Sequence, residues 1–276
     1  MTKKKILFIS QEITPYLEEN ELGHFGRYLP QGIQEKGKEI RTFMPKFGCI
    51  NERRNQLHEV IRLSGMNLII DDNDHPLIIK VASIQAARMQ VYFIDSEDFF
   101  QRKAIFHDKE SGKFFKDNDE RAIFFARGVL ETVKKLGWVP DIIHCHGWMT
   151  SLIPLYIKTS YKKEPIFENS KVVFSLYDNE FKPALNKNFA SKAMMEGISE
   201  EAIADYSETS FNGLNIAAMN ASDAVIKASE NVNKELEEHF TGIDKPTLNY
   251  QSPEDYIDAY SDFYDEILTS EEVLQD

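Results

Sequence analysis

Short apolar runs alternate along the chain with segments whose apolar residues recur at helical spacing. Residues 4–10 (KKILFIS) are a continuous apolar run, which indicates a strand covered on both faces. A helix ending at Gly37 is predicted next from the stripe Leu22, Phe25, Leu29 and Ile33, with a kink at Pro30. Residues 39–44 form a second buried strand, so the pattern predicts a right-handed β-α-β unit with parallel strands.

Between residues 57 and 95 the pattern lacks helix-length periodicity. Short apolar runs at residues 68–70, 77–83 and 90–94 are separated by turns, and residues 71–74 (DDND) are a clear turn cluster. We expect a β-rich excursion at the edge of the sheet.

The strand-helix alternation then returns. Asp117, Asn118 and Asp119 are predicted to cap a long helix. The inner stripe of that helix is Ile123, Ala126, Leu130 and Val133. Strands are predicted at residues 140–146, 171–176 and 224–226, and helices at about 149–160 and 211–220. The whole pattern predicts an α/β fold with a doubly wound, mostly parallel, Rossmann-like sheet.

Charge and cysteine content narrow the class of protein. The chain has 276 residues and a net charge of −13, which argues against nucleic acid and anionic membrane as partners. Residues 251–276 contain no Lys or Arg, so much of this charge lies in an acidic tail. Two cysteines, and no run near the ~20 apolar residues of a membrane span, predict a cytoplasmic protein.

Two histidines on one predicted strand are the most visible candidates for chemistry. His144 and His146 are two residues apart, so both side chains point to one face, whereas Cys145 points to the other. No further ligand set is spaced to complete a metal site, and we predict neither a metal nor a cofactor. His144 is predicted to be a hydrogen-bonded core histidine.

Three segments carry a resemblance to a known family. They are residues 117–148 (DNDERAIFFARGVLETVKKLGWVPDIIHCHGW), 174–179 (FSLYDN) and 222–229 (SDAVIKAS). In this order they resemble motifs in the N-terminal half of bacterial glycogen and plant starch synthases, the ADP-glucose-dependent glycosyltransferases of family 5. The resemblance runs from Lys4 to about Glu238 and implies the first half of the two-domain GT-B architecture.

The turn after the first strand departs from the family pattern. There the family has a Lys and paired glycines that hold the sugar-nucleotide phosphates. This chain has Glu18 and Asn20-Glu21 at those positions, and His24 replaces an Asp. Exchanging Lys for Glu beside a diphosphate turns attraction into repulsion of about 1 kcal/mol per contact in water, and several times more where screening is weaker.

The remaining pocket positions are partly kept. The resemblance implies that His146, Trp148 and Asn179 are inherited pocket residues, whereas Tyr177 stands in place of a family His. With His24, these are the candidate ligand-binding residues, and His146 is the residual catalytic candidate. Two simpler interpretations remain open: His24 belongs to a solvated helix face, and Trp148 is a packing residue.

The predicted organisation is an acceptor-side domain at residues 1–245 and an acidic tail at residues 246–276. Residues 252–268 form an amphipathic helix with the apolar stripe Tyr256, Ile257, Tyr260, Phe263, Tyr264 and Ile267. This resembles the closing helix of two-domain glycosyltransferases. We therefore expect Tyr260 and Phe263 to pack on the N-terminal domain, and we expect the donor-binding domain to be missing.

These departures predict a degenerate, non-catalytic domain that acts as a binding or regulatory module. The alternative is an ADP-glucose-dependent α-1,4-glucosyltransferase of glycogen biosynthesis, with a partner chain supplying the donor half. A third hypothesis is that the domain still binds glucan or another sugar but does not catalyse a reaction. The face of the former interdomain cleft is expected to be apolar and to bind a second copy or another protein.

Overall fold

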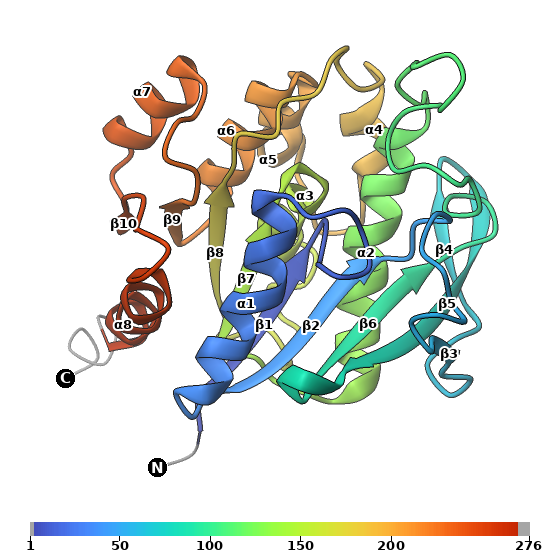
Figure 1. The fold of residues 1–276 in the computed structure, drawn as a ribbon. Helices are drawn as coiled ribbons and strands as arrows, with labels where there is room; N and C mark the ends of the chain where they lie inside the picture. Colours follow the sequence, from blue (N-terminus) through green and yellow to red (C-terminus); the bar gives the residue numbers. More distant parts are fainter. Residues whose placement is uncertain (1–2, 270–276) are drawn as a thin grey trace.

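A mostly parallel sheet forms the centre of the protein (Figure 1). The computed structural model describes residues 3–269, and within them ten strands form the order β10-β9-β8-β7-β1-β2-β6-β5-β3, with β4 paired to β5. The strands are β1 (Lys5–Ser10), β2 (Glu39–Pro45), β3 (His58–Glu59), β4 (Met66–Ile70), β5 (Asn73–Ile84), β6 (Met89–Asp95), β7 (Ile142–His146), β8 (Lys171–Leu176), β9 (Ala224–Lys227) and β10 (Thr247–Leu248). The predicted doubly wound α/β fold is confirmed.

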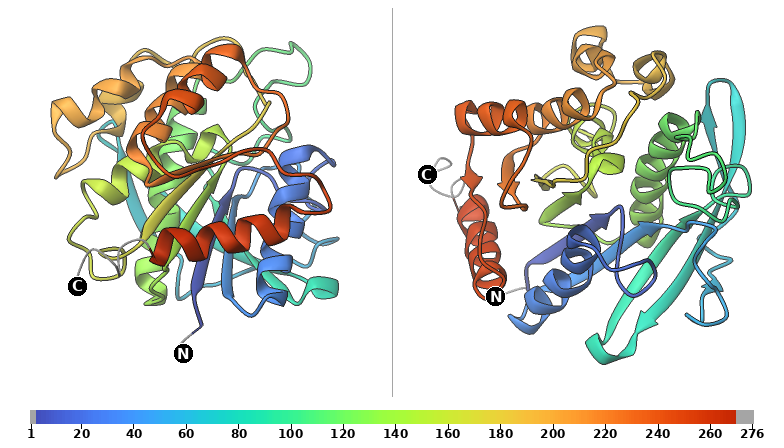
Figure 2. Two further views of the ribbon diagram at one scale, coloured as in Figure 1. Left: turned by 90° about the vertical axis from the view of Figure 1, so that its left-hand side faces the viewer. Right: turned by 45° about the horizontal axis from the view of Figure 1, so that its top comes forward.

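Helices cover both faces of this sheet (Figure 2). One face packs against α1 and α8, and the other against α2, α3 and α6. The helices are α1 (Glu21–Glu35), α2 (Asn118–Leu136), α3 (Leu152–Lys158), α4 (Phe189–Ala193), α5 (Glu200–Ala204), α6 (Phe211–Ala221), α7 (Lys234–Gly242) and α8 (Tyr256–Thr269). The two layers explain why the central strands are continuous apolar runs.

Alternation along the strands assigns each residue to one layer. In β1, Ile6 and Phe8 contact the layer of α1 and α8, whereas Leu7 and Ile9 contact the opposite layer. In β7 the predicted opposite orientation of Cys145 is confirmed, because it packs in the layer of α2, α3 and α6. The pattern of β7 thus places His144 and His146 under α1 and α8.

The β-rich excursion lies at one sheet edge, as predicted. Strand β5 is antiparallel to β3, β4 and β6, and β6 is parallel to β2. Asp71 and Asp72 connect β4 to β5 with φ angles of 50° and 61°. Two residues with positive φ suit the right-handed twist of a tight hairpin, and Asp accepts this conformation better than most residues.

Two local predictions were inaccurate. Asp117 does not cap α2 with its side chain, because its carboxylate pairs with Arg102 at 2.5 Å. The helix expected from residue 149 begins as a 3-10 turn at Trp148–Thr150 and continues as α3, because Gly147 leaves β7 with a φ of 87°.

Helix α8 packs against α1 and the neighbouring strands. Tyr260 and Phe263 are 1% and 5% exposed, as expected for packing on the domain. Gly32 of α1 allows the close approach, since a Cβ there would lie 2.6 Å from Ile257. At the other end Lys38 binds Asp265 at 2.9 Å. The acidic residues beyond position 269 lie outside the described part of the chain.

The start of α8 differs from the prediction. The helix was expected from residue 252 with a serine cap, whereas its first helical residue is Tyr256. The Ser252 hydroxyl donates to the Asp255 carboxylate at 2.8 Å, and the Ser252 carbonyl accepts from the Tyr256 amide. The turn at residues 253–255 leads directly into the helix, since this amide-to-carbonyl bond has the i to i−4 spacing of a helix.

The substitution Phe263→Ala is expected to lower the free energy of unfolding by about 3–5 kcal/mol, because it removes a buried ring between α8 and the sheet. Urea unfolding followed by circular dichroism measures this change. The neighbouring Asp262→Ala, at an exposed position, is the matched control and should stay within about 0.5 kcal/mol of the wild type. Equal stability of the two variants would contradict the packing role of α8.

Candidate functional site

The turn between β1 and α1 lies at the carboxyl ends of the parallel strands, the usual place for ligands in this fold class (Figure 1). Asn20 caps α1 by accepting the amide hydrogen of Gly23 at 2.7 Å, and it donates to the Glu12 carboxylate at 2.7 Å. Gly26 lets the helix approach the turn, since a Cβ there would lie 2.5 Å from the Glu12 carbonyl oxygen. The turn is therefore held by its own side chains.

Glu21, the first residue of α1, places a carboxylate at the N-terminus of the helix. This carboxylate accepts a short hydrogen bond from the Ser229 hydroxyl. The same hydroxyl accepts the amide hydrogen of Asp178 at 2.9 Å. A helix N-terminus stabilises anions, and here the anion is a side chain of the protein itself.

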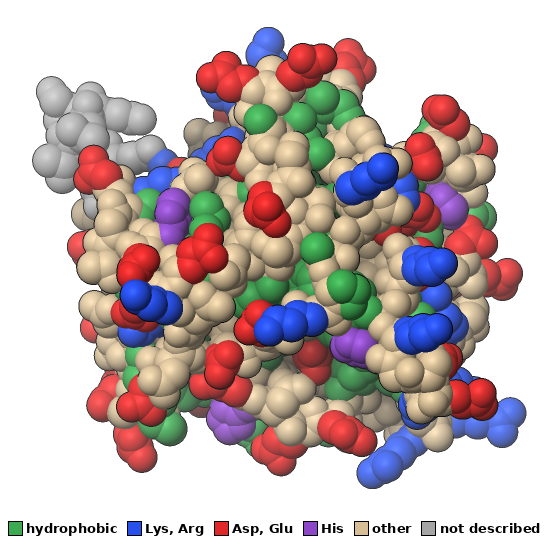
Figure 3. Space-filling model, turned by 90° about the horizontal axis from the view of Figure 1, so that it is seen from above, with side chains coloured by type: hydrophobic (Ala, Val, Ile, Leu, Met, Phe, Trp, Pro, Cys, Tyr) green, Lys and Arg blue, Asp and Glu red, His purple; other side chains and the backbone are tan. Residues whose placement is uncertain are grey.

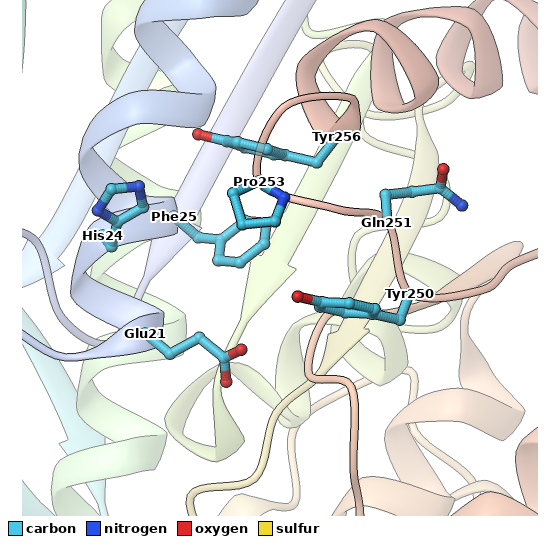
Figure 4. A pocket seen from close by; sticks show the side chains of 7 residues that line it. All are labelled: Glu21, His24, Phe25, Tyr250, Gln251, Pro253 and Tyr256. Atoms are coloured by element: carbon cyan, nitrogen blue, oxygen red, sulfur yellow. The ribbon is translucent and has the colours of Figure 1, made fainter.

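A small cavity of about 160 Å³ lies beside Glu21 (Figure 4). It is lined by Glu21, His24, Phe25, Tyr250, Gln251, Pro253 and Tyr256. The first three residues belong to α1, the next three to the segment that leads into α8, and Tyr256 is the first residue of α8. Sequence analysis found His24 but missed the tyrosines of this segment, because no motif links them to α1.

A larger cavity of about 690 Å³ lies beside the same turn. Its charged lining residues are Glu12, Glu18, Arg54 and Lys109, so both signs of charge face the space. Residues 104–107 form a further part of its wall. Sequence analysis named Glu18 but missed Arg54 and Lys109, which stand in loops without a recognisable pattern. Such a mixed polar lining can bind a neutral polar ligand.

The two strand histidines are fully buried. Their ring centroids are 3.9 Å apart. His144 hydrogen-bonds the Tyr264 hydroxyl at 2.6 Å and the Ser175 hydroxyl at 2.7 Å, which confirms a hydrogen-bonded core histidine. His146 Nδ1 shares a 2.6 Å hydrogen bond with the Tyr177 hydroxyl. Its Nε2 atom is buried without a hydrogen-bond partner among the described residues.

Burial sets the protonation state of these groups. Loss of hydration lowers the pKa of His144 well below its ordinary value and lowers the pKa of His146 to about 3. It also raises the pKa of Tyr177 well above the ordinary tyrosine value. Both histidines and the tyrosine are therefore uncharged at neutral pH.

The five predicted site residues do not line one pocket. His146 and Tyr177 share a hydrogen bond in the core layer of α1 and α8, and His24 lines the small cavity. Trp148 is 1% exposed and packs against Phe106 and Phe181 in the opposite core, with centroid distances of 5.0 and 4.7 Å. Asn179 is half-buried, and its Nδ2 atom has no hydrogen-bond partner within residues 3–269.

Two further findings concern metal and membrane binding. Within residues 3–269 there is no group of three or more His, Cys, Asp or Glu side chains placed to hold a metal ion. In the same part of the chain, every helix is too short or too polar to cross a bilayer.

Comparison with known proteins decides the family. The starch synthase catalytic domain family matches residues 5–246. The chain belongs to this family. It is 41% identical over 174 residues to a glycogen synthase of Chlorobium phaeobacteroides, a match that covers 63% of this chain and 36% of that protein. It is 35% identical over 248 residues to a glycogen synthase of Chlorobaculum tepidum, which covers 89% of this chain and 49% of that protein.

The fold agrees with this assignment. The family member resembles the catalytic domain of starch synthase IV from Arabidopsis thaliana, solved with ADP and acarbose, with a TM-score of 0.73 and 18% identity. The match covers 91% of this chain and 52% of that one. The chain thus spans between about a third and a half of the length of the curated relatives cited here.

The buried histidines predict a loss of stability in acid. In the unfolded chain His146 binds a proton below a pKa of about 6.5, whereas in the folded protein it stays neutral down to about pH 3. Acid therefore favours the unfolded state, and the free energy of unfolding falls as the pH drops through this range. From about pH 7 to about pH 5 the free energy of unfolding should fall by about 2 kcal/mol for His146 alone. Urea unfolding at the two pH values measures it.

The substitution His146→Gln should reduce this pH dependence. The matched control is His58→Gln, because His58 is exposed, and it should leave the dependence unchanged. An identical pH dependence in wild type and His146→Gln would contradict the assignment of His146 as a buried neutral group.

Proposed function

We propose that this glycogen-synthase-like domain does not transfer glucose by itself and acts as a cytoplasmic binding or regulatory module. The observation that carries the proposal is the Glu21 carboxylate at the N-terminus of α1, hydrogen-bonded to Ser229. In this proposal the carboxylate takes the position of a nucleotide phosphate, which would otherwise accept hydrogen bonds from the amides at the N-terminus of the helix. At a contact of about 4 Å, two like charges near a protein surface repel by about 4 kcal/mol.

The state of His146 supports the same proposal. This histidine matches the histidine of the family's His-Asp-Trp motif, and here it is neutral and buried under Tyr177. A group that acts on substrate must come within hydrogen-bond reach of it. His146 is fully buried and hydrogen-bonded to Tyr177, so it meets that condition only if Tyr177 moves.

A second candidate function is ADP-glucose-dependent α-1,4-glucosyl transfer in glycogen biosynthesis. It is favoured by the relatives, which are named glycogen synthases and are matched over 36–49% of their length. In this candidate another polypeptide supplies the donor-binding half. It would dock at the carboxyl-end face, where hydrophobic side chains gather in the middle of the view (Figure 3). A second copy of this chain is the other partner proposed for this face.

The two candidates make different predictions for turnover. Purified protein with ADP-glucose and glycogen is expected to incorporate no glucose, because the phosphate position is acidic and His146 is buried. A radiolabel assay measures this, with a lysate of the source cells added in a second arm to supply a partner. Incorporation by purified protein, lost in His146→Ala, would overturn the non-catalytic proposal.

Glucan is the proposed ligand of the module, with the larger cavity beside Glu12 as its site. We expect the protein to co-sediment with glycogen, and Arg54→Ala to weaken the association about threefold or more by removing one polar lining residue. Arg53→Ala is the matched control, because Arg53 is exposed and does not line the cavity. Equal losses in both variants would contradict this site, and no co-sedimentation would contradict glucan binding.

A further inference from the structure

The small cavity at the start of α1 has walls that are mainly aromatic (Figure 4). Phe25 and Tyr256 meet edge to face, with a centroid distance of 4.8 Å and an interplanar angle of 61°, and so form a corner. Tyr250 and Pro253 complete the walls. The volume of about 160 Å³ is close to that of protein cavities that hold benzene. The space therefore suits one small group.

A fixed carboxylate borders these rings. Figure 4 shows the Glu21 side chain directed toward the hydroxyl end of Tyr250, whereas the Gln251 amide points away from Glu21. The hydrogen bond from Ser229 holds the carboxylate in this position. Glu21 is an exposed residue at the edge of this aromatic space.

The charge balance around the cavity is negative. The N-terminus of α1 contributes the equivalent of about half a positive charge. The full charge of the Glu21 carboxylate, which lines the cavity, outweighs it. A phosphate or carboxylate ligand would be repelled here, and a cation would be attracted.

We propose that this cavity binds the ammonium group of a small organic cation. Faces of aromatic rings attract cations, and the attraction grows as the cation loses water in an enclosed site. The Glu21 carboxylate supplies the opposite charge at the mouth. A hexose is larger than benzene and needs hydrogen-bond partners for most of its hydroxyls, which suits this largely aromatic space less well. The site is independent of glucosyl transfer.

Choline is the probe that tests the proposal. Titration into the full chain, followed by two-dimensional amide NMR, should give saturable shifts centred on residues 21–25 and 250–256. The neutral analogue of choline, in which carbon replaces nitrogen, has the same shape without the charge. It should bind at least about fivefold more weakly.

Paired variants separate charge from shape. Glu21→Gln keeps the size of the side chain and an acceptor for Ser229, and it should weaken choline binding about fivefold or more. Glu19→Gln removes a carboxylate from the same turn outside the cavity and should change binding less than about twofold. Tyr250→Phe should retain binding, whereas Tyr250→Leu should lose it with the aromatic face.

Several outcomes would overturn the proposal. They are the absence of saturable shifts with choline, equal affinity for the neutral analogue, equal effects of Glu21→Gln and Glu19→Gln, and displacement of choline by maltose at comparable concentration. Circular dichroism and thermal unfolding establish that each variant folds. If Tyr250→Leu does not fold, the comparison of choline with its neutral analogue in the wild type still shows whether binding depends on the positive charge.

Discussion

The packing of α8 over the strand face that carries His144 and His146 is the interaction on which the rest of the structure depends. Folding buries two imidazole rings there, and the loss of their hydration costs free energy unless their nitrogens form hydrogen bonds within the protein. Tyr264 of α8 supplies one partner for His144, at 2.6 Å. Tyr260 and Phe263 of the same helix complete the apolar cover. Without α8, one face of β7, β8 and β9 would have no helix above it, so the helix belongs to the core of the domain.

The same packing also shapes the surface chemistry. The segment that leads into α8 crosses the start of α1, and this brings Tyr250 and Tyr256 beside Glu21. The helix that covers His144 therefore also helps to form a cavity at the strand ends. Both effects follow from one path of the chain, which leaves an aromatic space bordered by the Glu21 carboxylate.

Sequence patterns predicted the fold well because its strands are buried on both faces. The β8 prediction at residues 171–176 matches Lys171–Leu176, and the edge hairpin followed from the turn residues Asp71 and Asp72. Helix ends were less accurate. Asp117 looks like a cap, but a nearby Arg102 competes for its carboxylate. Local composition does not reveal such long-range partners.

The candidate site was harder to predict for a related reason. Family motifs identify positions, but the accessibility of a position depends on what packs above it. His146 and Trp148 lie two residues apart at the end of β7, yet His146 packs beside Phe8 and Tyr177 on one face of the sheet. Trp148 packs in the core on the opposite face. Tyr250 carries no motif and becomes part of a cavity only because Ser252 to Asp255 turn the chain into α8. The cavities of this domain therefore depend on the path of the last helix, since that path determines which side chains border a space open to a ligand.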